Sequence, residues 1–301
     1  MADMTPQDAL IVGVALAIVA ALVLTVDFVL VIAWLWPRDA TPDGTRTPVF
    51  ARKWSLVDPW IGGQAAVALL LWMIMLAMMV LAGSGANLVS KNSQPQVLIM
   101  LIGLILQNAL LVAIPVAYLN FKYGERVRDI GFSWLPTRRQ VAIGAAGGIA
   151  LILAGSGVEA GISAIAPRVL PGHVWATLER LSKSFSVETM FPDIASDWLQ
   201  FAGLFVAVAI AAPIGEEFFF RGFLHNSAKR RLGVFWGTLV SATAFALVHG
   251  GPLMVVAILP MGVILAVLYD RTGSLWVPII VHAVNNGAAI VALRFLPEGW
   301  R

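Results

Sequence analysis

The chain has no cysteine among its 301 residues. This absence excludes disulfides, thiolate metal ligands and cysteine nucleophiles. Charged residues are also scarce at 12%, which is about half the share of an ordinary soluble domain. Hydrophobic residues make up 59% of the chain, and so few charges cannot keep that much apolar side chain in water. The composition therefore excludes a water-soluble enzyme and indicates a membrane protein.

The sequence also lacks the basic stripe with interleaved aromatic residues that is typical of nucleic-acid binding. Its formal net charge of +3 comes from Lys and Arg residues that mostly lie in short loops between apolar runs. Most of these loops share one side of the membrane if the N-terminus is outside, and the basic side is normally cytoplasmic. We therefore expect no nucleic-acid partner, and both termini outside the cytoplasm.

Alternating segments of the kind that build a membrane β-barrel are missing as well. Eight apolar runs instead have about the length that a spanning helix needs. They cover residues 9–36, 60–83, 97–119, 141–166, 198–224, 232–248, 253–269 and 275–295. Because lipid offers no partner to backbone N–H and C=O groups, such runs form α-helices. The sequence predicts an all-α, polytopic membrane helix bundle, with a further short interfacial helix at residues 177–185.

Ionisable groups inside a membrane segment cost several kcal/mol unless they are paired or line a wet cavity. The polar and charged residues of the later runs include Glu216, Glu217, Arg221, His249, His282 and Asn286. Helical spacing separates their roles, because Glu217 and Arg221 are four residues apart and can pair, whereas Glu216 points about 100° away. If the fifth and sixth runs form a hairpin near Arg231, Glu216 and His249 reach the same depth. Such a hairpin would allow a carboxylate and an imidazole to share one site.

Three common proteolytic arrangements are absent: the zinc motif HExxH, a pair of aspartates in neighbouring helices, and a convincing Ser–His–Asp set. A glutamate with two histidines instead favours catalysis by activated water. Glu216 and His249 could hold the water, and His282 and Asn286 could donate to the oxyanion of an amide. Glu216 and the two histidines could equally bind zinc and leave one position open. The residues alone leave metal-free and zinc catalysis as alternatives.

Each feature has a purely structural interpretation when it is taken alone. Glu217 and Arg221 would most often form a structural ion pair, and His282 with Asn286 could join helices by hydrogen bonds. His173 and His225 lie in or beside polar segments, and we expect them to be solvated. The joint occurrence of these groups in three late runs favours a functional site.

Three motifs at these residues follow one another in the chain: EExxxR at 216–221, FxxxH at 245–249 and HxxxN at 282–286. In this order, and in separate apolar runs, they resemble the CPBP (CAAX protease and bacteriocin-processing, also ABI) family of intramembrane proteases. The resemblance covers roughly residues 198–293. It implies an eight-helix bundle with a protease core at 141–301, to which the helices within 1–140 are accessory.

The resemblance also implies an endopeptidase that cuts within or next to the membrane. Glu216 and His249 would activate water, His282 and Asn286 would stabilise the oxyanion, and no metal cofactor would be needed. Three other residues would support the site: Glu217, Arg221 and Phe245. The partners would be the lipid bilayer and a membrane-associated or lipidated peptide or protein, in a multi-pass protein of a prokaryotic plasma membrane.

Two other functions remain open at this point. A non-catalytic membrane protein of the same fold could act in immunity or as a scaffold. A proton-linked transporter could use the same glutamate and histidines as a relay. Polar groups along a path across several helices, together with internal repeats, would favour the transporter. Here the polar groups cluster in three late runs, which favours the protease.

Overall fold

The structure is a computed structural model that describes residues 54–83 and 94–296. Within these two ranges all regular secondary structure is helical, as the sequence predicted. The first predicted run, residues 9–36, lies outside the described residues.

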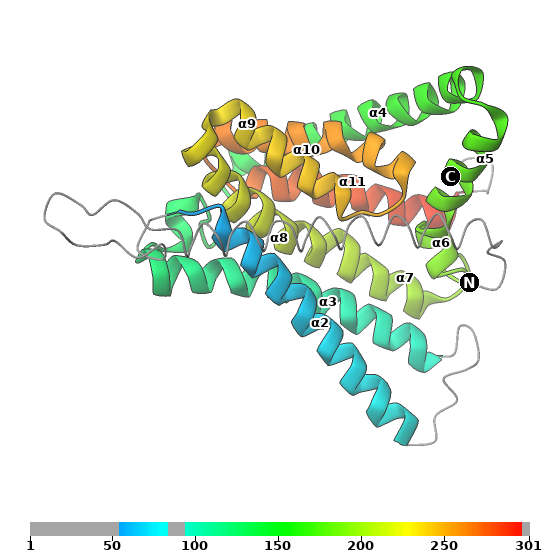
Figure 1. The fold of residues 1–301 in the computed structure, drawn as a ribbon, viewed down its shortest axis with the longest axis horizontal. Helices are drawn as coiled ribbons and strands as arrows, with labels where there is room; N and C mark the ends of the chain where they lie inside the picture. Colours follow the sequence, from blue (N-terminus) through cyan, green and yellow to red (C-terminus); the bar gives the residue numbers. More distant parts are fainter. Residues whose placement is uncertain (1–53, 84–93, 297–301) are drawn as a thin grey trace, which may run out of the picture. The chain divides into compact units, whose positions relative to one another are not determined.

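The described chain forms ten α-helices that are joined by loops and shorter helical turns (Figure 1). They are α2 (Val57–Gly83), α3 (Gln94–Ala117), α4 (Arg138–Val169), α5 (Gly172–Ser184), α6 (Val187–Met190), α7 (Trp198–Leu204), α8 (Ala212–Glu216), α9 (Asn226–Leu247), α10 (Pro252–Thr272) and α11 (Trp276–Phe295). Three segments are π-helical: η2 (Tyr118–Tyr123), η4 (Phe205–Ala211) and η5 (Glu217–His225). A 3₁₀ turn, η3 (Val127–Ile130), precedes α4. Segments η4 and η5 join α7, α8 and α9 into one continuous helical stretch.

That stretch, Trp198–Leu247, is 50 residues long and too long to cross a bilayer once, because at 1.5 Å per residue it would measure about 75 Å. It breaks at Gly233, where φ is +84° and ψ is 169°, a conformation that glycine adopts without strain. Beyond the break α9 packs back on η5, and the Ser241 hydroxyl donates to the Phe220 carbonyl at 2.8 Å. The predicted hairpin is therefore confirmed, with its turn two residues beyond Arg231.

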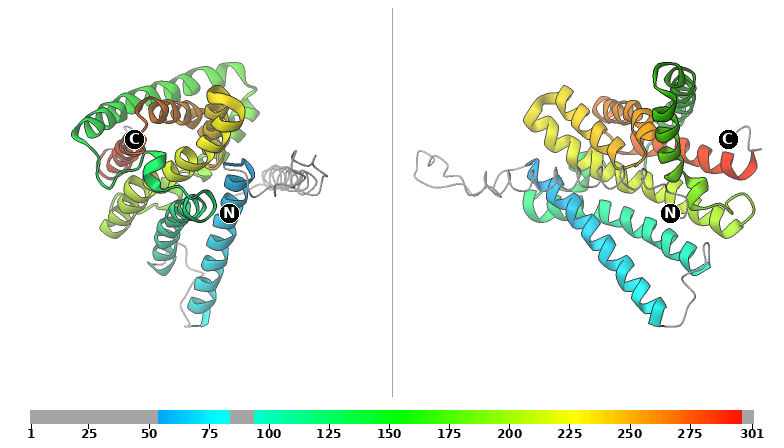
Figure 2. Two further views of the ribbon diagram at one scale, coloured as in Figure 1. Left: turned by 90° about the vertical axis from the view of Figure 1, so that its left-hand side faces the viewer. Right: turned by 45° about the vertical axis from the view of Figure 1, so that its right-hand side comes forward.

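Small residues bring the helices of this bundle together. Helix α4 lies along α11 (Figures 1 and 2), and a Cβ at Gly148 would come within 2.6 Å of Cβ of Val284. Gly262 of α10 meets Ala242 of α9 in the same way, because a Cβ at Gly262 would lie 3.0 Å from Cα of Ala242. Close backbone approach of this kind is how helices associate in lipid, where the hydrophobic effect between helices is weak.

Large apolar side chains cover the outer faces of the helices. Leu71, Leu153 and Phe235 are 61%, 71% and 72% exposed, which a protein in water does not tolerate over many helices. Among the described residues five segments are long and apolar enough to span a membrane, and Val57–Leu71 is a shorter apolar helix. The helical membrane bundle is thus confirmed, although the number of eight helices is not.

The connector, which we define as residues 170–197, links α4 to α7 and contains α5 and α6. The short helix predicted at residues 177–185 is present as α5, which begins five residues earlier. Phe191 and Ile194 of the connector are each 1% exposed and join a core cluster with Leu204 and Ile290. The second half of the connector is therefore packed firmly on the bundle.

Candidate active site

Glu216, the last residue of α8, lies beside both intramembrane histidines. Its Oε2 is 3.7 Å from Nε2 of His249 and 3.9 Å from Nε2 of His282. The three side chains come from the two arms of the hairpin and from α11. The glutamate side chain is 15% exposed. The fold thus brings together the three residues that the sequence placed in one site.

His249 follows the C-terminal end of α9. Its Nδ1 donates to the Phe245 carbonyl at 2.6 Å. Because a carbonyl oxygen only accepts, this bond places the proton on Nδ1 and leaves the lone pair of a neutral ring on Nε2, which faces Glu216. The side chain is 25% exposed, so His249 is the most accessible of the three residues.

Glu217 connects His282 to Arg221. Its Oε1 accepts from Nδ1 of His282 at 3.1 Å and from Nη1 of Arg221 at 2.9 Å. The Arg221 guanidinium also donates from Nη2 to the Gly262 carbonyl of α10 at 3.1 Å. The side chains of Glu217 and Arg221 are both fully buried. The predicted ion pair is confirmed, and it orients one of the two histidines.

Phe245 fills the space between these groups. Its ring centroid lies 4.7 Å from that of His249 and 5.6 Å from that of His282. Cζ of Arg221 lies 4.3 Å from the same centroid, a position that favours a cation–π interaction. The FxxxH motif therefore supplies a fully buried wall for both imidazoles.

Asn286 lies one turn beyond His282 on α11. Its Nδ2 donates to the carbonyl of Val208 in η4 at 3.0 Å, and its Oδ1 accepts from Asn285 at 3.4 Å. This contact uses one of the two N–H groups of its side-chain amide. The oxyanion role of Asn286 stays a prediction.

The expectation that His225 is solvated was wrong. Its side chain is fully buried, and its Nε2 lies 3.0 Å from Oδ2 of Asp270 on α10. Lys229 pairs with the other carboxylate oxygen. The hairpin covers His225 because η5 and the start of α9 pack against the end of α10, a tertiary contact that the local polar sequence does not reveal. His173 is exposed, as expected.

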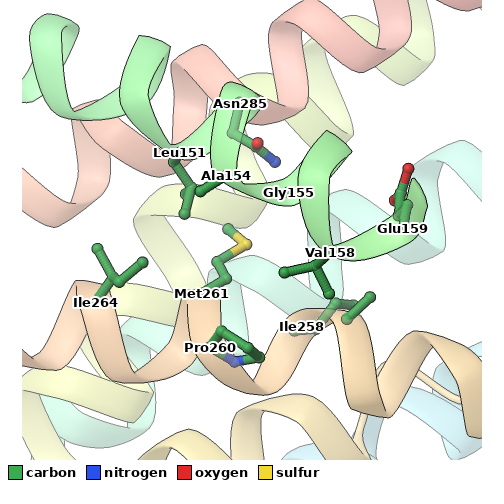
Figure 3. Close-up of a pocket in the computed structure, with 11 residues that line it drawn as sticks. Leu151, Ala154, Gly155, Val158, Glu159, Ile258, Pro260, Met261, Ile264 and Asn285 are labelled. Carbon is green, nitrogen blue, oxygen red and sulfur yellow. The ribbon is translucent and has the colours of Figure 1, made fainter. Parts of the chain in front are cut away.

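A cavity of about 120 Å³ lies between α4, α10 and α11 (Figure 3). Asn285 reaches into it from α11, and Glu159 lies at one end on α4. The remaining lining is apolar. Glu216, His249 and His282 do not line this cavity.

Sequence reasoning missed the contact between Glu217 and His282. Spacing on one helix identified Arg221 as the partner of Glu217, but it carries no information on a second helix. The signal was the adjacency of the two glutamates: on one helix turn they face different directions and can hold different parts of one histidine. Here Glu217 binds Nδ1 of His282 at 3.1 Å, and Glu216 faces Nε2 of the same ring at 3.9 Å.

A glutamate and two histidines thus lie close together inside a helical membrane bundle. Residues 198–288 match the family described as "Type II CAAX prenyl endopeptidase Rce1-like". The matched region contains all three motifs, and the resemblance to the CPBP family of membrane endopeptidases is confirmed there.

Three curated bacterial relatives match part of the chain. The "Putative membrane peptidase YdiL" of Bacillus subtilis is 31% identical over 32% of this chain and 39% of its own length. The "Membrane-embedded CAAX protease MroQ" of Staphylococcus aureus is 36% identical over 30% of this chain and 39% of its own length. The "UPF0177 protein in abiGi 5'region" of Lactococcus lactis is 29% identical over 40% of this chain and 47% of its own length. The chain spans less than half the length of the curated relatives it matches, and no solved structure matches it.

Proposed function

We propose that this protein is an intramembrane endopeptidase that hydrolyses peptide bonds with a water activated by Glu216 and His249. The observation that carries the proposal is the approach of one carboxylate oxygen to Nε2 of two histidines, within helices that span a membrane. The family match of residues 198–288 supports it independently.

The distances suit a water molecule between these groups. Gaps of 3.7 and 3.9 Å are too long for direct hydrogen bonds, and polar groups at such separations are commonly bridged by water. Oε2 of Glu216 is buried and has no hydrogen-bond partner among the described residues. A water donating to Oε2 of Glu216 and to Nε2 of His249 would satisfy both acceptors.

In the proposed reaction the water oxygen attacks the carbonyl carbon while Glu216 takes the proton. His282, protonated on both nitrogens, keeps its Nδ1 proton on Glu217 and donates from Nε2 to the developing oxyanion. Asn286 would be the second donor. Glu216 then passes its proton to the leaving nitrogen as the C–N bond breaks, which releases an acid and an amine.

The proposed substrates are membrane-associated or lipidated peptides and proteins. The family description names CAAX prenyl endopeptidases, and one relative is named a CAAX protease. The apolar surface of the described helices supports a substrate that is delivered within or along the bilayer. The proposed setting is a multi-pass protein of a prokaryotic plasma membrane, with residues 1–140 accessory to a core at 141–301.

A library of membrane-associated peptides, incubated with the purified protein in liposomes, tests this function. We expect internal cleavage by the wild type, with products identified by mass spectrometry, and none by His249→Ala or His282→Ala. Because residues that act as a unit are not additive, each loss should be nearly complete. Failure of the wild type to cleave any peptide, combined with normal cellular function of both variants, would favour the alternative of a non-catalytic immunity or scaffold protein.

A further inference from the structure

The connector touches the turn that carries His249. The Ser182 hydroxyl of α5 accepts a hydrogen bond from the backbone N–H of Leu253, in the first turn of α10, at 3.1 Å. Phe185, directly after α5, lays its ring on Gly250, the residue that follows His249. The connector therefore contacts the chain one residue after His249, whose imidazole is proposed to activate the water.

Gly250 and Gly251 of this turn pack so closely against the connector that no side chain fits at either position. A Cβ at Gly250 would lie 2.8 Å from Cδ1 of Phe185, and one at Gly251 would lie 2.9 Å from Cα of Ser182. Gly250 also has φ of +79°, which other residues rarely adopt. The conformation of the turn therefore requires glycine at position 250, and its packing depends on the connector.

The connector is itself fixed to the bundle. Phe191 and Ile194 are buried in the core, and the Thr189 hydroxyl of α6 donates to the Lys183 carbonyl of α5 at 2.8 Å. Helix α5 is amphipathic, has no buried residue of its own, and rests on α10 and α4. These contacts make α5 a brace whose C-terminal end is tied to α6 and also touches the turn that carries His249.

We infer that Ser182 and Phe185 are positioning residues that set the place of the His249 ring relative to Glu216. The imidazole has one hydrogen bond of its own, to Phe245, and its 3.7 Å gap to Glu216 leaves room for one water. A displacement of about 1 Å in such a site is enough to lower a rate by two orders of magnitude. The inference rests on the proposed function, because it gives a role in positioning to the same histidine.

The first test needs no substrate. The chain has four histidines; His225 and His282 are buried, so after His173→Gln the exposed imidazole is that of His249. In liposomes, the rate of its carbethoxylation by diethyl pyrocarbonate, followed by mass spectrometry, reports how firmly the turn holds the ring. We expect Ser182→Ala to raise this rate about fivefold, as for one lost hydrogen bond, and Phe185→Ala to raise it as well.

Ser184→Ala is the matched control, because the Ser184 hydroxyl bonds the Leu181 carbonyl within the same helix and is exposed. It should leave the modification rate unchanged, and Ser182→Thr, which retains the hydroxyl, should restore the wild-type rate. Equal rates in Ser182→Ala and Ser184→Ala would overturn the inference.

The second test uses activity. Ser182→Ala should lower kcat about fivefold while KM stays within twofold, because the brace acts on the catalytic ring and not on substrate binding. If Ser182→Ala lowers only the folded yield and the folded fraction has a normal kcat, Ser182 has a structural role and the inference is wrong. A wild type without activity would contradict the proposed function, and the modification rates would still decide the inference.

Discussion

At the scale of single residues, the site depends on one buried ion pair. Glu217 and Arg221 are both fully buried, and Glu217 also holds His282. Removing one partner of such a pair leaves an uncompensated charge away from water. We therefore expect stability and the proposed catalysis to be coupled at this ion pair.

Arg221→Ala should destabilise the folded protein by about 3–5 kcal/mol and lower activity with it. The matched control is Lys183→Ala, which removes an exposed pair with Glu179 of the same four-residue spacing and should cost less than about 1 kcal/mol. The thermal unfolding midpoint of the detergent-solubilised variants measures both. An Arg221→Ala protein as stable as the wild type but inactive would instead place Arg221 in the chemistry.

The metal requirement is also decided at this scale. The proposed mechanism needs no metal, whereas the alternative uses Glu216, His249 and His282 as zinc ligands. We expect active purified protein to contain far less than one zinc per chain by plasma emission spectrometry, and chelators to leave its activity unchanged. Stoichiometric zinc, with activity lost on chelation and regained on addition of zinc, would establish the zinc mechanism.

The site residues were predictable because lipid makes polar groups conspicuous. Glu216, His249 and His282 stood out as ionisable groups in apolar runs, and the hairpin argument gave two of them the same depth. The bond from His282 to Glu217 was not predictable, because it joins residues 65 positions apart, and helical spacing gives only neighbours on one helix. The burial of His225 was missed for the same reason.

At the scale of elements, glycines set the contact of α4 with α11. Gly148 faces Val284, and Gly144 faces Ile280 one turn earlier. A Cβ added at either glycine would lie 2.6 Å from the Cβ of the residue it faces. Farther along α4, Gly157 faces open space. One helix therefore offers both a test position and its control.

Gly148→Ala should destabilise the bundle by about 1–3 kcal/mol, because the added methyl overlaps Val284 and forces α4 away from the helix that carries His282. Gly157→Ala should be neutral or slightly stabilising, since alanine is the better helix former by about 1 kcal/mol. Thermal unfolding of the two variants provides the comparison. Equal stability of both would show that α4 does not pack on α11 through this face.

The helices themselves were predictable from the apolar runs, but their interruptions were not. The runs at 198–224 and 232–248 appear in one stretch that is broken at Gly233. The π-helical turn η4 has no signature in hydrophobic periodicity, because its residues are all apolar. Only part of α5 was predicted as a helix. The contact of the connector with the turn at Gly250 was not predictable, because it joins residues far apart in the sequence.

At the scale of the whole molecule, the distribution of basic residues predicts which ends of the helices face the cytoplasm. Arg271, at the end of α10, should be cytoplasmic, and Glu188, in the connector, should be outside. Both side chains are exposed, and the chain has no cysteine to interfere. In intact cells an impermeant thiol reagent should label Glu188→Cys and not Arg271→Cys. The reverse pattern would invert the orientation.

The central claim is that the Glu216 carboxylate activates the water that cleaves the peptide. Single-turnover cleavage of one peptide substrate by Glu216→Gln, beside the wild type and Glu159→Gln, tests it most directly. Glu159 is the control because it is an exposed glutamate of α4, outside the cluster around Glu216. The account predicts a loss of at least about 10³-fold for Glu216→Gln at unchanged folded yield, with Glu159→Gln close to wild type. Full activity of folded Glu216→Gln would contradict it.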